Sequence, residues 1–460
     1  MTGFREDTIC AIATPYAVGS IGIIRISGER SKEIVSKIFL PKGKRGVFDV
    51  AGFSGIYGNI IDNKTNEIID DVIVFVYNSP KSYTGEEVCE ISCHGGLYIL
   101  KRVLRLCVEN GARLAEGGEF TKRAFLNGKL SLTQAEAVMD VISASGEQSS
   151  RAARSAREGS TFRAVSEIKS ILLSADASLA VWADYPEEDI GEVSPDELLE
   201  KLENARAKAK KLLDGYDTAR IIKNGVDTVI VGKPNVGKST LMNMLSGSEK
   251  SIVTEIAGTT RDVVEEVITL DGVVLNLADT AGLRETDDPV ERLGVSLANK
   301  KLEGSYLVLA VFDGSRRLEQ EDEELISKLD GRNCVAIINK SDLPQILEED
   351  KIREKISHIV YTTAKENSGK EELISCVREI LSLKDAEFSS GVIANERQRS
   401  CIVNALESID EAVDGLNMGM SYDAVNISID YALESLMELT GERVSEAVVD
   451  EVFSKFCVGK

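Results

Sequence analysis

The sequence has few of the features that mark exported, membrane-bound or disordered chains. Only 8 of its 460 residues are proline, against 37 glycine, which argues against extensive disorder. The longest apolar run, residues 306–312, is far shorter than the ~20 residues of a transmembrane helix. No apolar stretch follows the charged residues near the N-terminus, so a signal peptide is not expected. These absences predict a cytoplasmic protein that stays out of membranes.

Cysteine is present, but not in a pattern that binds metal or forms bridges. The eight cysteines include no Cys-x-x-Cys pair, and Cys89 and Cys93 are the nearest two. Without an export signal, this spacing argues against disulfides and against structural zinc. The expected compartment is therefore a reducing cytoplasm.

Acidic residues are in excess, with a net charge of −22. Such a charge argues against a chain that coats nucleic acid or an anionic membrane. Residues 101–163 run against this trend, with 11 Lys/Arg and 7 Asp/Glu. This stretch is either an ordinary solvated helix face or a local contact for RNA.

In the first half of the chain the sequence pattern changes once, from strand-like to helical. Short β-branched runs at 21–26 and 72–76, bounded by Gly, Ser or Pro, predict strands in the first 120 residues. From about 130 to 215, apolar residues recur at helical spacing, and an acidic segment with two prolines near 184–195 indicates a loop. Thr133 and Glu136 have capping-box spacing at the start of the first helix.

From residue 226 apolar strands alternate with helical segments, which is typical of a mostly parallel, doubly wound sheet with helices on both faces. The strands are expected at residues 226–231, 273–278, 307–312, 335–338 and 359–361. Three more amphipathic helices follow after about residue 385. A helical region divided by an α/β region predicts an insertion, with residues 120–220 and 385–460 packing as one bundle.

Residues 232–239, Gly-Lys-Pro-Asn-Val-Gly-Lys-Ser, match the phosphate-loop motif and lie between a predicted strand and a predicted helix. Glycines let the backbone wrap the phosphates, and the helix N-terminus favours the anion. Lys238 would reach the β- and γ-phosphates, and Ser239 would bind Mg²⁺. The residues expected to contact the nucleotide here are Asn235, Val236, Gly237, Lys238, Ser239 and Thr240.

Further motifs follow in the order found in GTPases. They are Thr259-Thr260, Asp279-Thr280-Ala281-Gly282, Asn339-Lys340-Ser341-Asp342 and Thr363-Ala364-Lys365. Asp342 can accept both N–H donors of guanine, which adenine does not offer in that arrangement. Thr363 stands where serine is usual, which weakens this last match. Leu283 follows the second motif, so the water-orienting glutamine of Ras-type enzymes is missing there. A monovalent cation beside Asn235 could supply the positive charge of an arginine finger.

Blocks along essentially the whole chain resemble the MnmE (TrmE) family of tRNA modification GTPases. The similar blocks are residues 7–15, 22–28, 82–86, 90–96, 118–129, 254–262 and 456–460. The resemblance implies a multidomain α/β and all-α protein with an inserted TrmE-type G domain. Its parts would be an N-terminal folate-binding and dimerisation domain (1–120), a helical domain (121–222 and 385–460) and the G domain (223–384).

The resemblance also implies a potassium-activated GTPase. The ion would lie among Asn235, Thr254, Ile256 and Thr259, with Ser239 and Thr260 on Mg²⁺. Glu291 would help to orient the attacking water, although the bare sequence marks it only as an ordinary acid. In the N-terminal domain, 5,10-methylene- or 5-formyl-tetrahydrofolate would contact Arg25, Glu90, Lys129 and Lys460. Without the resemblance, Arg25 would be taken for a surface or edge charge.

Two further residues have competing interpretations. Cys457 matches a candidate reactive thiol of the family, but it could also be a cysteine of a helical core. Val458 replaces the commoner isoleucine beside it. His94 precedes two glycines and is either a general base or part of a tight turn.

The resemblance implies partners as well. They are a second copy of the chain, tRNA, and an FAD-dependent MnmG subunit in a heterotetramer that modifies C5 of uridine 34. No Gly-x-Gly-x-x-Gly occurs here, which fits a flavin on the other subunit. A ribosome-assembly switch of the Era or Der type would share the G motifs. A folate-dependent aminomethyltransferase with an acquired G domain is a third interpretation. The flanks favour the first, because they are acidic or mixed rather than a basic RNA-binding module.

Overall fold

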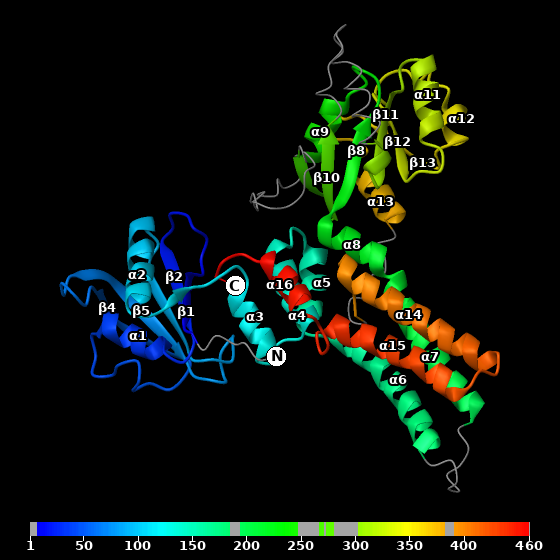
Figure 1. Cartoon of the computed structure of the whole chain (residues 1–460). Helices are drawn as coiled ribbons and strands as arrows, with labels where there is room; N and C mark the ends of the chain where they lie inside the picture. The colour runs from blue at the N-terminus through cyan, green and yellow to red at the C-terminus, as the bar shows by residue number, and fades with distance from the viewer. Residues whose placement is uncertain are drawn as a thin grey trace, which may run out of the picture. The chain divides into compact units, whose positions relative to one another are not determined.

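The computed structural model describes residues 7–184, 194–246, 266–270, 273–279, 302–381 and 391–459. The chain forms two compact units. The first consists of Met1–Met139 with Met420–Lys460, and the second of Asp140–Gly419. Figure 1 shows both, coloured along the chain. Among the described residues, we find no helix with the length and apolarity that crossing a bilayer requires.

A seven-stranded sheet forms the centre of the first unit. In spatial order its strands are β3 (Phe39–Pro41), β4 (Ser54–Ile61), β5 (Ile68–Tyr77), β6 (Val88–His94), β2 (Ile21–Ser27), β1 (Ile9–Ile12) and β7 (Arg113–Leu114). Only β1 and β7 pair in parallel. One face is buried beneath α1 (Ser31–Ile38) and α2 (Leu97–Glu109) (Figure 1). The strands predicted at 21–26 and 72–76 are confirmed.

Four helices complete the first unit. They are α3 (Glu119–Leu126), α4 (Leu132–Ser143, which the unit boundary divides), α15 (Tyr422–Thr440) and α16 (Glu446–Ser454). Leu132, Ala135 and Val138 of α4 pack with Val452 and Phe453 of α16. These residues are confirmed as core, whereas Ile142 and Ala447, which the helical spacing also placed on the apolar stripes of α4 and α16, are exposed.

The predicted capping box of α4 is wrong by two residues. The backbone N–H of Ser131 donates to Gln134 Oε1 (3.0 Å), and the Gln134 N–H donates to Ser131 Oγ (3.3 Å). Thr133 lies inside the helix and is buried. The Ser131–Gln134 and Thr133–Glu136 pairs both have capping-box spacing. The helix begins with the earlier pair, which places the fully buried Leu132 in its first turn.

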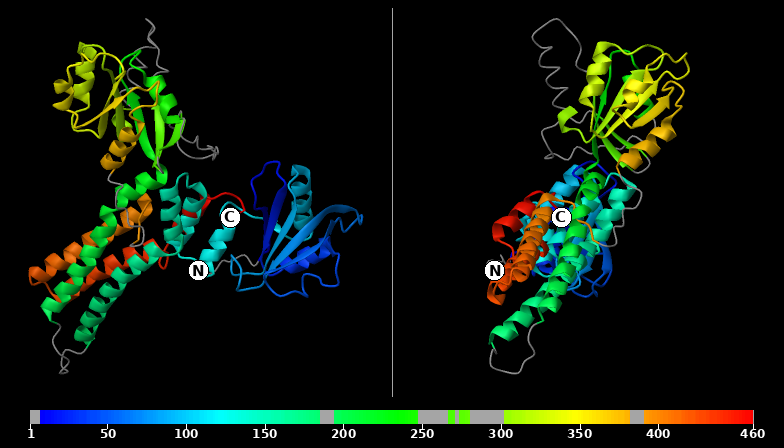
Figure 2. Two further views of the ribbon diagram at one scale, coloured as in Figure 1. Left: turned by 180° about the vertical axis from the view of Figure 1, so that it is seen from behind. Right: turned by 90° about the vertical axis from the view of Figure 1, so that its right-hand side faces the viewer.

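Five helices of the second unit belong to the segments before and after its α/β region: α5 (Glu147–Arg157), α6 (Ser160–Asp184), α7 (Pro195–Asp214), α8 (Tyr216–Asn224) and α14 (Glu396–Asn417). Helix α7 runs beside α6 and α14 (Figure 2), and Arg206 of α7 pairs with Asp410 of α14 at 2.6 Å. The segments before and after the α/β region thus contact each other. The loop predicted near 184–195 falls mostly outside the described residues.

The second sheet has six strands in the order β13 (His358–Thr362), β12 (Cys334–Asn339), β11 (Leu307–Asp313), β8 (Val226–Val231), β10 (Val273–Asp279) and β9 (Glu266–Leu270). All neighbours are parallel except β9 and β10. The five predicted strands are confirmed. The sequence prediction missed β9, because a short edge strand with alternating burial gives a weak signal.

Helices cover both faces of this sheet, as predicted. Helices α8, α9 (Lys238–Ser246) and α13 (Lys370–Ile380) pack on one face, and α11 (Gln320–Lys328) and α12 (Glu349–Arg353) on the other. The carboxyl ends of the parallel strands therefore meet at one edge. In such sheets, ligands bind at that edge.

Candidate functional site

The phosphate loop follows β8 and leads into α9, as predicted. A Cβ atom on Gly232 would lie 2.4 Å from the Val311 carbonyl oxygen, and one on Gly237 would lie 2.1 Å from Asn339 Nδ2. Both glycines also have positive φ, +142° and +105°. Only glycine fits at these two points, where the backbone passes close to its neighbours, as in loops whose amides bind phosphate.

Lys238 lies along the backbone of this loop. Its ammonium donates to the carbonyl oxygens of Gly232 (2.6 Å) and Lys233 (2.9 Å). Ser239 is exposed in the first turn of α9, and Asn235 is exposed in the loop with a φ of +66°. A cation, a hydroxyl and a helix N-terminus therefore share one short segment, a donor set that suits phosphate and Mg²⁺.

Asn339 joins three predicted segments of the site. Its buried side chain donates from Nδ2 to the Val236 carbonyl oxygen (2.8 Å). Its Oδ1 accepts from the Ala364 N–H and the Thr362 hydroxyl, both at 3.2 Å. Thr363 lies beside Ser341, with their hydroxyl oxygens 2.9 Å apart. Lys365 and the carboxylate of Asp342 are exposed at this edge. The structure thus brings the phosphate loop and both predicted guanine loops together.

Asp313, at the end of β11, was missed by sequence reasoning. Its Oδ2 lies 2.5 Å from Lys340 Nζ, and its Oδ1 accepts from the Ser315 N–H and hydroxyl. Burial alone would raise the pKa of Asp313, but the bonds from Lys340 and Ser315 lower it below the usual range. The carboxylate is therefore charged and holds Lys340, whose φ is +62°. The one sign of this role in the sequence was the position of Asp313 at the end of a predicted strand.

Several predicted site residues lie outside the described residues. They are Thr254, Ile256, Thr259, Thr260, Thr280, Ala281, Gly282, Glu291 and Lys460. Asp279 ends β10, and only its backbone is described.

In the first unit, Arg25 and Glu90 are paired neighbours on β2 and β6. Arg25 Nε lies 2.8 Å from Glu90 Oε1, and both side chains are mostly buried. The guanidinium lies between the rings of Tyr83 (5.5 Å) and Phe120 (5.6 Å). Because β2 lies between β6 and β1, Arg25 is not the surface or edge charge that it would be by default.

The C-terminal segment, residues 457–459, also contacts Arg25. The Gly118 N–H donates to the Cys457 carbonyl oxygen (3.3 Å), and Arg25 Nη1 donates to the Gly459 carbonyl oxygen (3.2 Å). A Cβ on Gly459 would lie 2.4 Å from the Ile12 carbonyl oxygen. Cys457 is exposed, so the alternative of a buried core cysteine is wrong.

Lys129 follows α3, and its side chain approaches the loop between β5 and β6 that carries Tyr83. Its ammonium donates to the Pro80 carbonyl oxygen (3.0 Å) and is exposed. Arg25, Glu90 and the C-terminal segment are therefore in direct contact, whereas Lys129 approaches the same loop from beside Gly85.

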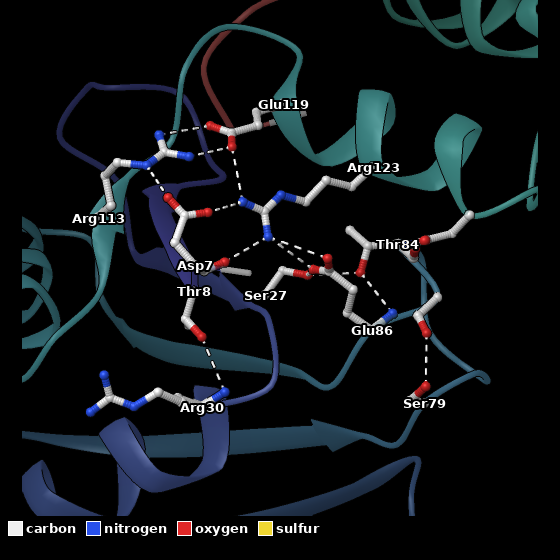
Figure 3. A network of polar contacts seen from close by, with 12 residues as sticks. Asp7, Thr8, Ser27, Arg30, Ser79, Thr84, Glu86, Arg113, Glu119 and Arg123 are labelled. Carbon is white, nitrogen blue, oxygen red and sulfur yellow. Dashed lines mark hydrogen bonds and ion pairs between the residues drawn. The ribbon is translucent and has the colours of Figure 1, made fainter. Parts of the chain in front are cut away.

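A buried ionic network, which sequence reasoning also missed, supports this region (Figure 3). Arg123 of α3 bonds to Asp7 (2.7 Å), Glu119 (3.0 Å) and Glu86 (3.2 Å). Arg113 binds Asp7 and Glu119, each at 2.5 Å. Burial alone would raise the pKa of Asp7 and of Glu119, but the two guanidinium groups lower both. The only sign of this network in the sequence was the spacing of Glu119 and Arg123, which are four residues apart.

This network fixes two segments that contact Arg25. Helix α3 carries Phe120, and the loop between β5 and β6 carries Tyr83. The Tyr83 and Thr121 hydroxyl oxygens are 2.9 Å apart, which joins the two segments directly.

His94, at the end of β6, bonds through Nδ1 to Asp70 Oδ1 (2.7 Å). This hydrogen bond raises the pKa of His94, whose ring is exposed. The following Gly95 exchanges backbone bonds with Gly19 and Ser20. A Cβ on Gly95 would lie 2.5 Å from the Gly19 carbonyl oxygen, so the tight turn requires glycine.

The second sheet, its phosphate loop and its Asn-Lys-Ser-Asp segment define the class of protein: a P-loop GTPase with a further α/β unit and a helical region. Comparison with known families is more specific. The model described as "GTP-binding protein TrmE N-terminus" matches residues 8–129, and the model "MnmE helical domain" matches residues 132–457.

Relatives match over their whole length. The protein "tRNA modification GTPase MnmE" of Acetivibrio thermocellus is 40% identical over 463 residues, covering 99% of this chain and 100% of that protein. The protein of the same description from Geobacillus kaustophilus is 41% identical over 467 residues, covering 100% of both. The chain belongs to the MnmE family of tRNA modification GTPases.

Proposed function

We propose that this chain hydrolyses GTP in the service of wobble-uridine modification. With an FAD-dependent MnmG subunit, it would add an aminomethyl or carboxymethylaminomethyl group to C5 of uridine 34 in tRNA. The single observation that carries the proposal is the match to MnmE proteins along the whole chain, flanks included. No described feature favours the ribosome-assembly or tRNA-independent alternative.

In the G domain, each predicted site residue has a proposed role, and the described ones among them have a geometry that suits it. The loop amides and Lys238 would bind the β- and γ-phosphates, and Asp342 would accept the guanine N–H groups. Ser239 and Thr260 would bind Mg²⁺, and Asp279 with Gly282 would face the γ-phosphate. Support comes from Asn339, which holds the phosphate and guanine loops at one sheet edge.

Potassium would lie beside Asn235, with Thr254, Ile256 and Thr259, and would supply the charge of an arginine finger. Glu291 would orient the attacking water. The exposed amide of Asn235, in its left-handed conformation, supports this arrangement. We expect potassium to accelerate GTP hydrolysis strongly over sodium. We also expect Glu291→Ala to keep GTP affinity while losing most turnover. Equal turnover in the two salts would overturn the potassium mechanism.

In the first unit, a one-carbon tetrahydrofolate (5,10-methylene or 5-formyl) would bind at Arg25, Glu90, Lys129 and Lys460, near the Cys457 thiol. The donor set fits this group, because the Glu90 carboxylate can accept pterin N–H bonds and cations can pair with the glutamate tail. Calorimetry with 5-formyl-tetrahydrofolate tests the site. Arg25→Ala should weaken binding at least about tenfold, since it removes a charge-assisted contact. Arg30→Ala, in an exposed pair with Glu33, is the matched control.

We further propose a homodimer formed by the N-terminal domains and placed in the cytoplasm. The domains would be 1–120, 121–222 with 385–460, and 223–384. The sheet face opposite α1 and α2 supports the dimer, because Tyr57, Ile73 and Phe75 are exposed side by side there. An apolar sheet face of this kind suits an interface between copies.

A further inference from the structure

Lys233, the second residue of the phosphate loop, is nearly enclosed. Only 9% of its side chain is exposed. Its ammonium lies 2.5 Å from Glu319 Oε2, 3.1 Å from Glu321 Oε2 and 3.7 Å from Asp322 Oδ2. Lysine side chains are mostly solvated unless they are paired. Three acids around one lysine therefore make a specific anchor rather than a chance surface contact.

The acids are held in place by the start of α11. Glu319 is the N-cap residue of this helix, and its N–H donates to Asp322 Oδ2 (3.1 Å). Acidic side chains at a helix N-terminus are favoured by the helix dipole. Arg316 lies 3.9 Å from both Glu319 and Asp322. The hydrogen bond to Glu319 raises the pKa of Lys233, so the anchor stays charged.

The anchor acts on the part of the loop that carries Asn235. Asn235 has a φ of +66°, in the left-handed region that asparagine tolerates better than most residues and that its surroundings help to keep. Two residues before it, Lys233 ties the loop to α11. On the other side, Lys238 donates to the carbonyl oxygens of Gly232 and Lys233.

Only one of these two restraints is independent of the nucleotide. In its proposed role, Lys238 reaches the phosphates, so its bonds to the loop carbonyls compete with that role. The bonds of Lys233 go to the start of α11, so a nucleotide that recruits Lys238 need not break them. We infer that Lys233 is a positioning residue, which holds the phosphate loop on α11 so that Asn235 can bind the activating cation. This inference rests on the proposed cation role of Asn235.

The test is GTP hydrolysis by the full chain over a range of potassium concentrations. Lys233→Met should raise the half-saturating potassium concentration roughly fivefold or more, the effect of losing a charge-assisted hydrogen bond. Lys233→Arg should restore most of the potassium affinity. Lys351→Met is the matched control, because Lys351 of α12 pairs with Glu323 of α11 on the exposed surface. It should leave the potassium dependence unchanged.

A half-saturating concentration in Lys233→Met equal to that of the unaltered chain would overturn the inference. If Lys233→Met does not fold, the double variant Glu319→Gln with Glu321→Gln opens the same anchor through exposed residues and must give the same shift. If potassium does not activate the unaltered chain, the proposed cation mechanism fails. In that case an unchanged KM for GTP in Lys233→Met would overturn the anchor as well.

Discussion

Single buried polar side chains set the geometry of the nucleotide site. Asp313, at the end of β11, is charged and pairs with Lys340 of the Asn-Lys-Ser-Asp segment. Asp313→Asn keeps the shape but removes the charge, so Lys340 loses its partner. We expect GDP affinity to fall about tenfold, the equivalent of ~1.4 kcal/mol. Titration with a fluorescent GDP analogue measures this.

Asp330→Asn is the matched control for Asp313, because Asp330 pairs with Lys355 on the exposed surface at 2.5 Å. Exposed pairs contribute little, so the control should bind GDP normally. An Asp313→Asn variant with unaltered affinity would show that Lys340 needs no such support.

His94 provides a pH-dependent prediction, again at the scale of one residue. Its bond to Asp70 raises its pKa, so the folded chain favours the protonated ring. The stabilisation is present below the ordinary pKa of about 6.5 and is lost as the pH rises through the raised value. Since the chain has only two histidines, NMR titration resolves each. Asp70→Asn should lower the pKa of His94, and no change at His94 would contradict the account.

At the scale of elements, the ionic network joins α3, β7 and the loop before β6. Arg123→Met would leave Asp7 and Glu119 with Arg113 alone, and it would remove the guanidinium that pairs with Glu86. Breaking one partner of a buried ion pair typically costs about 3–5 kcal/mol. We expect the unfolding midpoint of the first unit to fall accordingly, measured by chemical denaturation. Arg151→Met, which removes an exposed pair with Glu147, should change stability by less than about 0.5 kcal/mol.

The network also has a defined acid dependence. The pKa values of Asp7 and Glu119 are lowered in the folded chain. Their contribution is present above the ordinary carboxyl range near pH 4 and is lost as the pH falls through the lowered values. An Arg123→Met variant as stable as the unaltered chain at pH 7 would contradict the assigned role of the network.

The sequence predicted elements well and the contacts between distant elements poorly. The helical regions after residue 130 and the parallel strands of the second sheet were found because their apolar periods are regular, and the phosphate loop because its motif is contiguous. Helices α1, α2 and α3 were not predicted. The pairing of Arg25 with Glu90 depends on β2 lying beside β6, which no local pattern specifies. Likewise Arg123 finds Asp7 and Glu86 across 116 and 37 positions of sequence. The early start of α4 was decided by burial of Leu132 rather than by capping preference.

At the scale of the whole molecule, the proposed dimer makes a distinct prediction. Ile73 is 42% exposed on the open face of the first sheet. Its paired neighbours are Tyr57 on β4 and Ser92 on β6. Ile73→Asp would place a charge in the proposed interface. Analytical ultracentrifugation should find a monomer where the unaltered chain is a dimer. Leu173→Asp, at a comparably exposed position on α6, should stay dimeric. Dimers in both variants would place the interface elsewhere.

The central claim is that GTP hydrolysis by this chain serves tRNA modification, and nucleoside mass spectrometry tests it most directly. Bulk tRNA would be compared from cells that lack the chain and from cells supplied with the unaltered chain, with Lys238→Ala or with Lys351→Met. The account predicts that 5-aminomethyl-type wobble uridines disappear without the chain. They should return with the unaltered chain and with Lys351→Met, but not with Lys238→Ala. Full modification in cells without the chain, or full restoration by Lys238→Ala, would contradict it.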